Sequence, residues 1–110
     1  MERLSKIIQP IYQKFLPEAK KKNICFNLDF PDTTLKVANA CDLEKKLSKI
    51  LKVAFKRSTN ESVSIFVHPG KVTIKDTGIL LDNVTRENFK KDNLEVKSRI
   101  GFGTEITIKF

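Results

Sequence analysis

Four lysines in the middle of the chain are the first residues whose type and spacing could do chemistry. Lys45, Lys49, Lys52 and Lys56 follow one another at intervals of four, three and four residues. On an α-helix this spacing places them on one face, here called the lysine stripe. Rows of ammonium groups attract phosphates and carboxylates. The sequence leaves three interpretations of the stripe open: a solvated helix face, a surface for an acidic protein partner, or a contact for nucleic acid. Because the sequence contains no nucleic-acid-binding motif, a nucleic-acid contact is the least favoured.

Little else in the chain suggests catalysis. His68 is the only histidine, and it stands directly before Pro69 and Gly70, which is typical of a turn. The triplet Asp76-Thr77-Gly78 also has the composition of a turn that follows a strand. No nucleophile and base stand together in a mutually supporting pattern. We therefore expect no catalytic residue.

The two cysteines, Cys25 and Cys41, lie far apart in the sequence and form no CxxC motif. Two cysteines and one histidine cannot build a four-ligand zinc site without help from carboxylates. We expect free, partly buried thiols, with a disulfide as the alternative, and no metal site.

Composition limits the class of protein. The chain has 110 residues with 40% hydrophobic and 31% charged residues, which predicts one compact domain over residues 1–110. No apolar run approaches the roughly 20 residues of a membrane span, and charges at Glu2 and Arg3 argue against a signal peptide. We expect a cytoplasmic protein without a membrane contact. The net charge of +8 favours anionic partners or serves solubility alone.

Apolar residues recur at helical spacing in two segments. The first is residues 3–22, where Pro10 and Pro17 predict a late start or a kink, and the run from Lys20 to Asn23 predicts the end. The second is residues 40–57, for which Asn39 is a suitable N-cap.

Alternation of apolar and polar residues predicts the strands. They cover residues 24–30, 35–37, 63–67, 71–76, 94–97 and 104–110. Residues 77–93 are expected to be a loop with one helical turn near residues 84–90. This order predicts an α+β fold, a two-layer sandwich in which helices cover one face of a mixed, mostly antiparallel sheet.

Three segments, in this order, resemble the nucleotide-binding motifs of the ATP-binding domain of sensor histidine kinases, the GHKL or Bergerat-fold ATPases. Residues 39–58 resemble the capped N-box helix of that family. Residues 72–78 are similar to its strand and turn ending in Asp-x-Gly, and residues 94–104 are similar to its closing hairpin with Gly-x-Gly-Thr. Residues 3–37 fit the family's opening helix and two strands, so the resemblance covers nearly the whole chain.

The resemblance implies a nucleotide site whose adenine side is retained. By the family pattern, Asp76 bonds the adenine amino group, Gly78 lets the base approach, and Thr104 supports the aspartate. Lys56 matches a position that often contacts phosphate in the family. Lys49 matches the first N-box asparagine, and a lysine there can meet a phosphate but cannot coordinate magnesium.

The departures from the family concern the phosphate side. Val53 matches the second N-box asparagine, which holds magnesium in the family, and a valine offers no oxygen to a hard cation. Leu80 matches the second glycine of the Asp-x-Gly turn. After Phe89 the family has a flexible lid, a glycine-rich phosphate turn and another helix, whereas here only residues 90–93 precede Leu94. Without a metal to neutralise charge on the phosphate oxygens, phosphoryl transfer loses several kcal/mol of stabilisation.

The sequence therefore predicts a reduced, degenerate histidine-kinase-like ATPase (Bergerat) fold that lacks the ATP lid. The expected function is that of a catalytically inactive signalling or regulatory module that works through protein binding, with no required cofactor. The alternatives are a sensor that binds ATP or ADP without magnesium or phosphotransfer, and a basic nucleic-acid-binding protein. Loss of the family's third helix would uncover apolar sheet surface, so a homodimer or a tight protein partner is expected to cover it.

Overall fold

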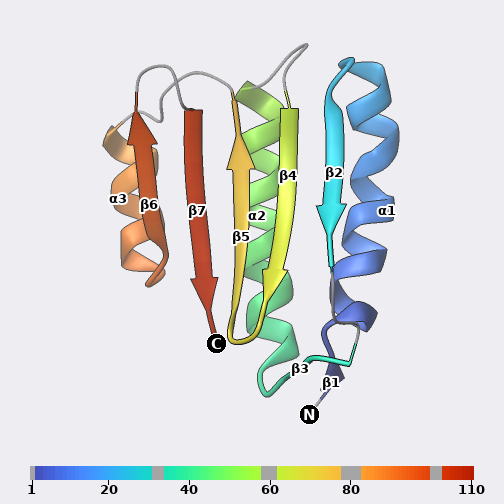
Figure 1. Ribbon diagram of the computed structural model, residues 1–110. Coiled ribbons are helices and arrows are strands. Elements are labelled where there is room, and N and C mark those ends of the chain that lie inside the picture. Colours follow the sequence, from blue (N-terminus) through green and yellow to red (C-terminus); the bar gives the residue numbers. More distant parts are fainter. Residues whose placement is uncertain (1, 31–33, 58–61, 78–82, 100–102) are drawn as a thin grey trace.

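The computed structural model describes residues 2–30, 34–57, 62–77, 83–99 and 103–110. It shows a five-stranded sheet with helices on one side and a small two-stranded sheet near the N-terminus (Figure 1). In chain order the elements are β1 (Glu2–Arg3), α1 (Ser5–Lys21), β2 (Cys25–Asp29), β3 (Lys36–Val37), α2 (Ala40–Arg57), β4 (Ser62–His68), β5 (Lys71–Asp76), α3 (Asn83–Lys91), β6 (Glu95–Arg99) and β7 (Gly103–Lys109). The fold is the predicted two-layer α+β sandwich.

The large sheet has the strand order β2-β4-β5-β7-β6. β2 runs parallel to β4, and every other neighbouring pair is antiparallel. The sheet is therefore mixed and mostly antiparallel, as predicted. The short predicted strand at residues 35–37 corresponds to β3, which pairs with β1 and not with the large sheet.

Helix α1 begins at Ser5 and continues through both prolines to Lys21. The predicted late start is therefore wrong. The buried stripe of α1 stabilises it across the missing donors, because most helical stability in proteins comes from burying an apolar face. Its end is as predicted: Asn23 has a φ of 56°, and the amide of Ile24 returns to the carbonyl of Ala19 at 2.8 Å.

Helix α2 begins at the predicted residue. The side-chain Oδ1 of Asn39 accepts a hydrogen bond from the backbone amide of Asp42 at 3.1 Å, which is the N-cap that the sequence indicates. Leu47 and Leu51 are fully buried beneath the helix. Phe55 stacks on Phe15 of α1 at 5.5 Å between ring centroids. These contacts fix α2 on the sheet and leave its opposite face outward.

Helix α3 extends over Asn83–Lys91, so the predicted loop with a single helical turn is wrong in this region. Phe89 anchors α3 with no exposed surface, and Asn93, two residues after the helix ends, has a φ of 62°. Figure 1 shows α3 behind β6 and α2 behind β4 and β5, with α1 alongside β2. The sheet therefore keeps a covering helix at the β6 end.

The sheet face that carries no helix is mainly polar. By the strand register it presents residues such as Asn27, Ser64, Lys75 and Glu105, with Phe66 among them. The expectation of an uncovered apolar sheet surface is thus wrong, because α3 covers one end and the open face has few apolar side chains.

Cys25 and Cys41 are both free and both exposed. The free thiols match the prediction, but their expected partial burial was wrong, because Cys25 faces the open side of β2 and Cys41 lies on the outer surface of α2. Within the described ranges, no helix combines the length and apolar character that crossing a membrane requires.

Candidate functional site

The end of β5 meets the start of β7, and two predicted site residues come together there. Asp76 pairs directly with Thr104 in the antiparallel ladder. Both are buried, with exposed fractions of 3% and 1%. The hydroxyl of Thr104 lies 3.1 Å from the hydroxyl of Ser98 on β6. These residues, with Gly103, form what is called here the β5–β7 corner.

Gly103 brings the two strands of this corner into close contact. Its φ is +81°, in the region that favours glycine. A Cβ built on Gly103 would lie 1.9 Å from the carbonyl oxygen of Asp76 and 2.8 Å from the Cα of Thr77. Only a glycine lets the backbone of β7 approach Asp76 this closely. Gly103 therefore positions Asp76 and Thr104 relative to each other.

A hollow of about 550 Å³ adjoins the corner and contains residues that the sequence did not single out. Thr104, Ser98 and Gly103 line it, together with Arg86 from α3. The Nε of Arg86 is buried and has no hydrogen-bond partner among the described residues. Lys75, Lys97 and the carboxylate of Glu105 also line the hollow, so its three cations outnumber one anion and favour an anionic ligand.

The phosphate side of the predicted site differs from this corner. The Nζ of Lys49 lies 2.6 Å from Oδ2 of Asp92, which follows the end of α3. The same ammonium lies 5.8 Å from the centroid of the Phe89 ring. Lys49 is therefore held by an internal carboxylate and an aromatic ring. A phosphate would have to displace Asp92 to reach it.

Val53 occupies the position that the resemblance assigns to a magnesium ligand. Its half-buried side chain carries no oxygen or nitrogen atom. One carboxylate, that of Glu44, lines the hollow that contains Val53, and the carboxylate of Asp92 is engaged by Lys49. A hard divalent cation needs several oxygen ligands in a fixed arrangement. The described residues around Val53 therefore do not fit a magnesium ion.

The connection from α3 to β6 has no room for a lid. Helix α3 ends at Lys91 and β6 begins at Glu95, so three residues join them. The amides of Asn93 and Leu94 bond back to carbonyls of α3, at 3.0 and 3.1 Å. The chain thus turns tightly from α3 into β6.

The predicted site residues are distributed unevenly. Asp76 and Thr104 meet as expected. Lys56 is exposed near the end of α2, which leads to β4, and β4 starts beside Asp76. Lys49 lies two turns earlier on α2, about 10 Å along the helix axis, in its own ion pair. Gly78 and Leu80 lie outside the described residues.

Sequence reasoning missed Ser98 and Gly103 of the corner, and Arg86 of the adjoining hollow. The Gly-x-Gly-Thr pattern contained a signal for Gly103, since an isolated glycine at a strand end marks a close backbone approach. Arg86 had no such signal, because its segment was expected to be a loop.

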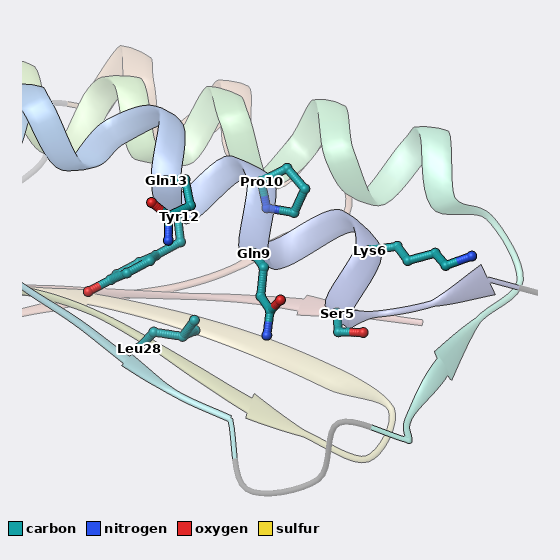
Figure 2. Close-up of a pocket in the computed structure, with 7 residues that line it drawn as sticks. All are labelled: Ser5, Lys6, Gln9, Pro10, Tyr12, Gln13 and Leu28. Atoms are coloured by element: carbon teal, nitrogen blue, oxygen red, sulfur yellow. The ribbon is translucent and has the colours of Figure 1, made fainter.

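A larger hollow, of about 870 Å³, lies at the opposite edge of the sheet between α1 and β2. Figure 2 shows its lining, with Gln9, Tyr12 and Gln13 from α1 and Leu28 from β2. The hydroxyl of Tyr12 donates a hydrogen bond to the carbonyl of Phe26 at 3.0 Å. Neutral amides and hydroxyls dominate this lining, which offers no acid–base pair. It is separate from the predicted nucleotide site.

Comparison with known proteins shows the fold but no family assignment. No family model matches the sequence. No curated protein matches it either. Solved structures do: the catalytic domain of histidine kinase ThkA superposes with a TM-score of 0.73 at 15% identity, over 96% of this chain and 90% of that chain.

Two further solved structures are similar. The Acinetobacter baumannii histidine kinase AdeS matches with a TM-score of 0.72 at 16% identity, over 99% of this chain and 64% of that chain. ThkA in complex with the response regulator protein TrrA matches with a TM-score of 0.70 at 16% identity, over 96% of this chain and 39% of that chain. The chain therefore has the fold of a histidine kinase ATP-binding catalytic domain, as the sequence resemblance implied.

Proposed function

We propose that this chain is a histidine-kinase-like signalling module that acts by binding another protein and does not transfer phosphate. The observation that carries the proposal is Val53 at the metal position of the fold, beside a lysine already paired with Asp92. Phosphoryl transfer depends almost wholly on positioning and on cations that neutralise the phosphate oxygens. A site that lacks the metal ligand and the lid has lost both contributions.

A protein partner is the remaining use of such a scaffold. One similar solved structure contains ThkA in complex with the response regulator protein TrrA, so this fold occurs in kinases that bind signalling proteins. The sequence predicted either a second copy of the chain or a different protein. The described surface supports a different protein, because α3 and the polar open face remove the reason for self-association. We therefore expect light scattering at high concentration to report a monomer.

Turnover of ATP tests the proposal. The chain is incubated with Mg²⁺ and ATP, and released phosphate and protein-bound phosphate are measured. We expect no turnover above background. The isosteric substitution Asp76→Asn separates the two sources of a weak signal: a contaminating ATPase persists in the variant, whereas turnover that disappears with Asp76→Asn contradicts the proposal.

A second candidate, a sensor that binds ATP or ADP without phosphotransfer, is favoured by one observation. Arg86 places a buried, unpartnered Nε beside the hollow at Thr104, where two more cations line the wall. Asp76, Gly78 and Thr104 would hold the base, with Lys49 and Lys56 as the candidate phosphate contacts. Calorimetric titration with ADP tests it, because heat that falls in Asp76→Asn and Arg86→Ala supports a nucleotide at this corner. No heat, or heat unchanged by both substitutions, removes the candidate.

A further inference from the structure

A lysine of α1 lies beside three lysines of the stripe on α2. A hollow of about 570 Å³ lies over α2 and is lined by Lys45, Lys49 and Lys52 of the stripe and by Lys14 of α1. We call these four lysines and the surface between them the lysine groove. Because Lys14 comes from a second helix, the cations enclose a surface and do not merely follow one helix.

The charges of this groove are largely unbalanced. Lys14, Lys45 and Lys52 form no ion pair with any described residue, and only Lys49 does. Like charges three or four residues apart destabilise a helix, so the groove costs stability unless an anion occupies it. One acidic side chain, that of Glu44, lines its rim.

Lysines elsewhere in the molecule provide a contrast. The Nζ of Lys109 lies 2.6 Å from Glu95, and this hydrogen-bonded ammonium lowers the pKa of the Glu95 carboxyl. Lys22 and Lys90 also face acidic residues of their own helices. Internal pairing is therefore available to lysines of this chain, but three of the four groove lysines have none among the described residues.

We infer that the lysine groove is the docking surface for an acidic segment of a protein partner. This rests on the proposed function and names the chemistry of the partner that the module would bind. The argument is charge complementarity: three unpaired ammonium groups and one that can exchange its carboxylate lie around a single outward-facing hollow. Neighbouring lysines of the stripe are spaced about 5 to 6 Å apart along the helix axis. Carboxylates one helical turn apart, or on alternate residues of an extended segment, have a similar spacing.

Nucleic acid fits the groove less well. The sequence contains no nucleic-acid-binding motif. Single-stranded nucleic acid also needs aromatic rings for base stacking. The large exposed apolar side chains of the described chain are Val84 and Phe110, and neither lies on α1 or α2. The groove offers charge without a stacking platform, which suits carboxylates.

The test measures binding of a fluorescent oligoglutamate peptide of about 15 residues to the whole chain at low salt. The groove variant is Lys14→Glu, Lys45→Glu and Lys52→Glu, which leaves Lys49 and Lys56 in place. The matched control is Lys20→Glu, Lys36→Glu and Lys71→Glu, which makes the same change of charge on exposed positions that line neither the lysine groove nor the hollow at the β5–β7 corner. Circular dichroism checks that both variants fold.

We expect the groove variant to weaken binding by at least about tenfold, and the control by less than about threefold. Binding should also fall steeply with salt. Equal weakening in both variants, or no binding by the native chain, overturns the inference. Tighter binding of a single-stranded oligonucleotide of equal charge, lost in the groove variant, assigns the surface to nucleic acid and also overturns it.

Failure here is distinct from failure of the proposed function. ATP turnover that depends on Asp76 rejects the inactive module but leaves peptide binding at the groove supported. Absence of peptide binding in a chain that is also inert toward ATP rejects the groove alone.

Discussion

Two regions of the molecule differ in how far their residues serve the scaffold. One is the β5–β7 corner, and the other is the α2–α3 side, which comprises Lys49 and Val53 of α2, Phe89 of α3 and Asp92 just after α3. At the corner, Gly103 permits a backbone approach that no other residue allows, and Asp76 and Thr104 are buried partners in the ladder. On the α2–α3 side, Val53 and Lys49 lie on the outward part of a helix. Lys49 is about half exposed, and Val53 is only partly buried where it packs against the core.

This difference affects how strongly each residue supports the proposed function. Residues of the corner hold β5 and β7 together, so the fold retains them whether or not a nucleotide binds. Lys49 and Val53 contribute less to the scaffold than the corner residues do, so a change at either costs less stability. The presence of Asp76 and Thr104 is therefore only weak support for nucleotide binding. Val53, at the position that the resemblance assigns to a magnesium ligand, supports the proposed inactivity more strongly.

The corner should be the more fragile half. We expect Gly103→Ala to destabilise the protein by more than about 4 kcal/mol, because its methyl group would overlap the carbonyl oxygen of Asp76, at 1.9 Å. Urea denaturation followed by circular dichroism measures the loss.

Gly70 supplies the matched control. Its φ is also positive, at +77°, but an added Cβ would meet only the carbonyl oxygen of Phe110, at 3.6 Å. Gly70→Ala should therefore cost only the backbone strain, about 1 to 2 kcal/mol. Similar losses for the two variants would contradict the importance assigned to the close approach.

The α2–α3 side depends on one buried ring. Phe89 has no exposed surface and anchors α3 against the rest of the core. We expect Phe89→Ala to cost about 3 to 5 kcal/mol and Phe89→Leu clearly less, because the leucine fills part of the cavity. Chemical denaturation gives both values. A loss below about 1 kcal/mol for the alanine variant would show that α3 does not belong to the folded unit.

The Lys49–Asp92 ion pair should contribute least. Both side chains are partly exposed, at 48% and 39%, and exposed pairs contribute about 0.2 to 1 kcal/mol. A double-mutant cycle with Lys49→Ala and Asp92→Ala measures the coupling, which should decrease in high salt. A coupling above about 2 kcal/mol would mean that the pair holds α3 in place and is part of the scaffold.

Much of this arrangement could be predicted from local patterns. The N-cap at Asn39 and the alternation in β4, β5 and β7 act over a few residues, and the structure confirms them. The pairing of Asp76 with Thr104 was reached only through the resemblance, because it joins residues far apart in the sequence.

Helix α3 shows what pattern reading missed. The residues Lys90-Lys91-Asp92-Asn93 repeat the ending of α1, Lys20-Lys21-Lys22-Asn23, and both asparagines adopt a positive φ. This ending predicted the end of α1, but it did not predict α3. The reason is that α3 has a single buried residue, Phe89, and therefore little apolar periodicity. The ion pair of Lys49 with Asp92 could not be foreseen, since it depends on where α3 ends in space.

Magnesium dependence tests the central claim most directly. ADP is titrated calorimetrically into the native chain with excess Mg²⁺ and again with a chelator. With Val53 at the metal position, we predict that the two titrations agree within about twofold in affinity, or that neither shows binding. An affinity that rises tenfold or more with Mg²⁺ would contradict the account, because the α2–α3 side would then hold a metal ion that its residues do not fit.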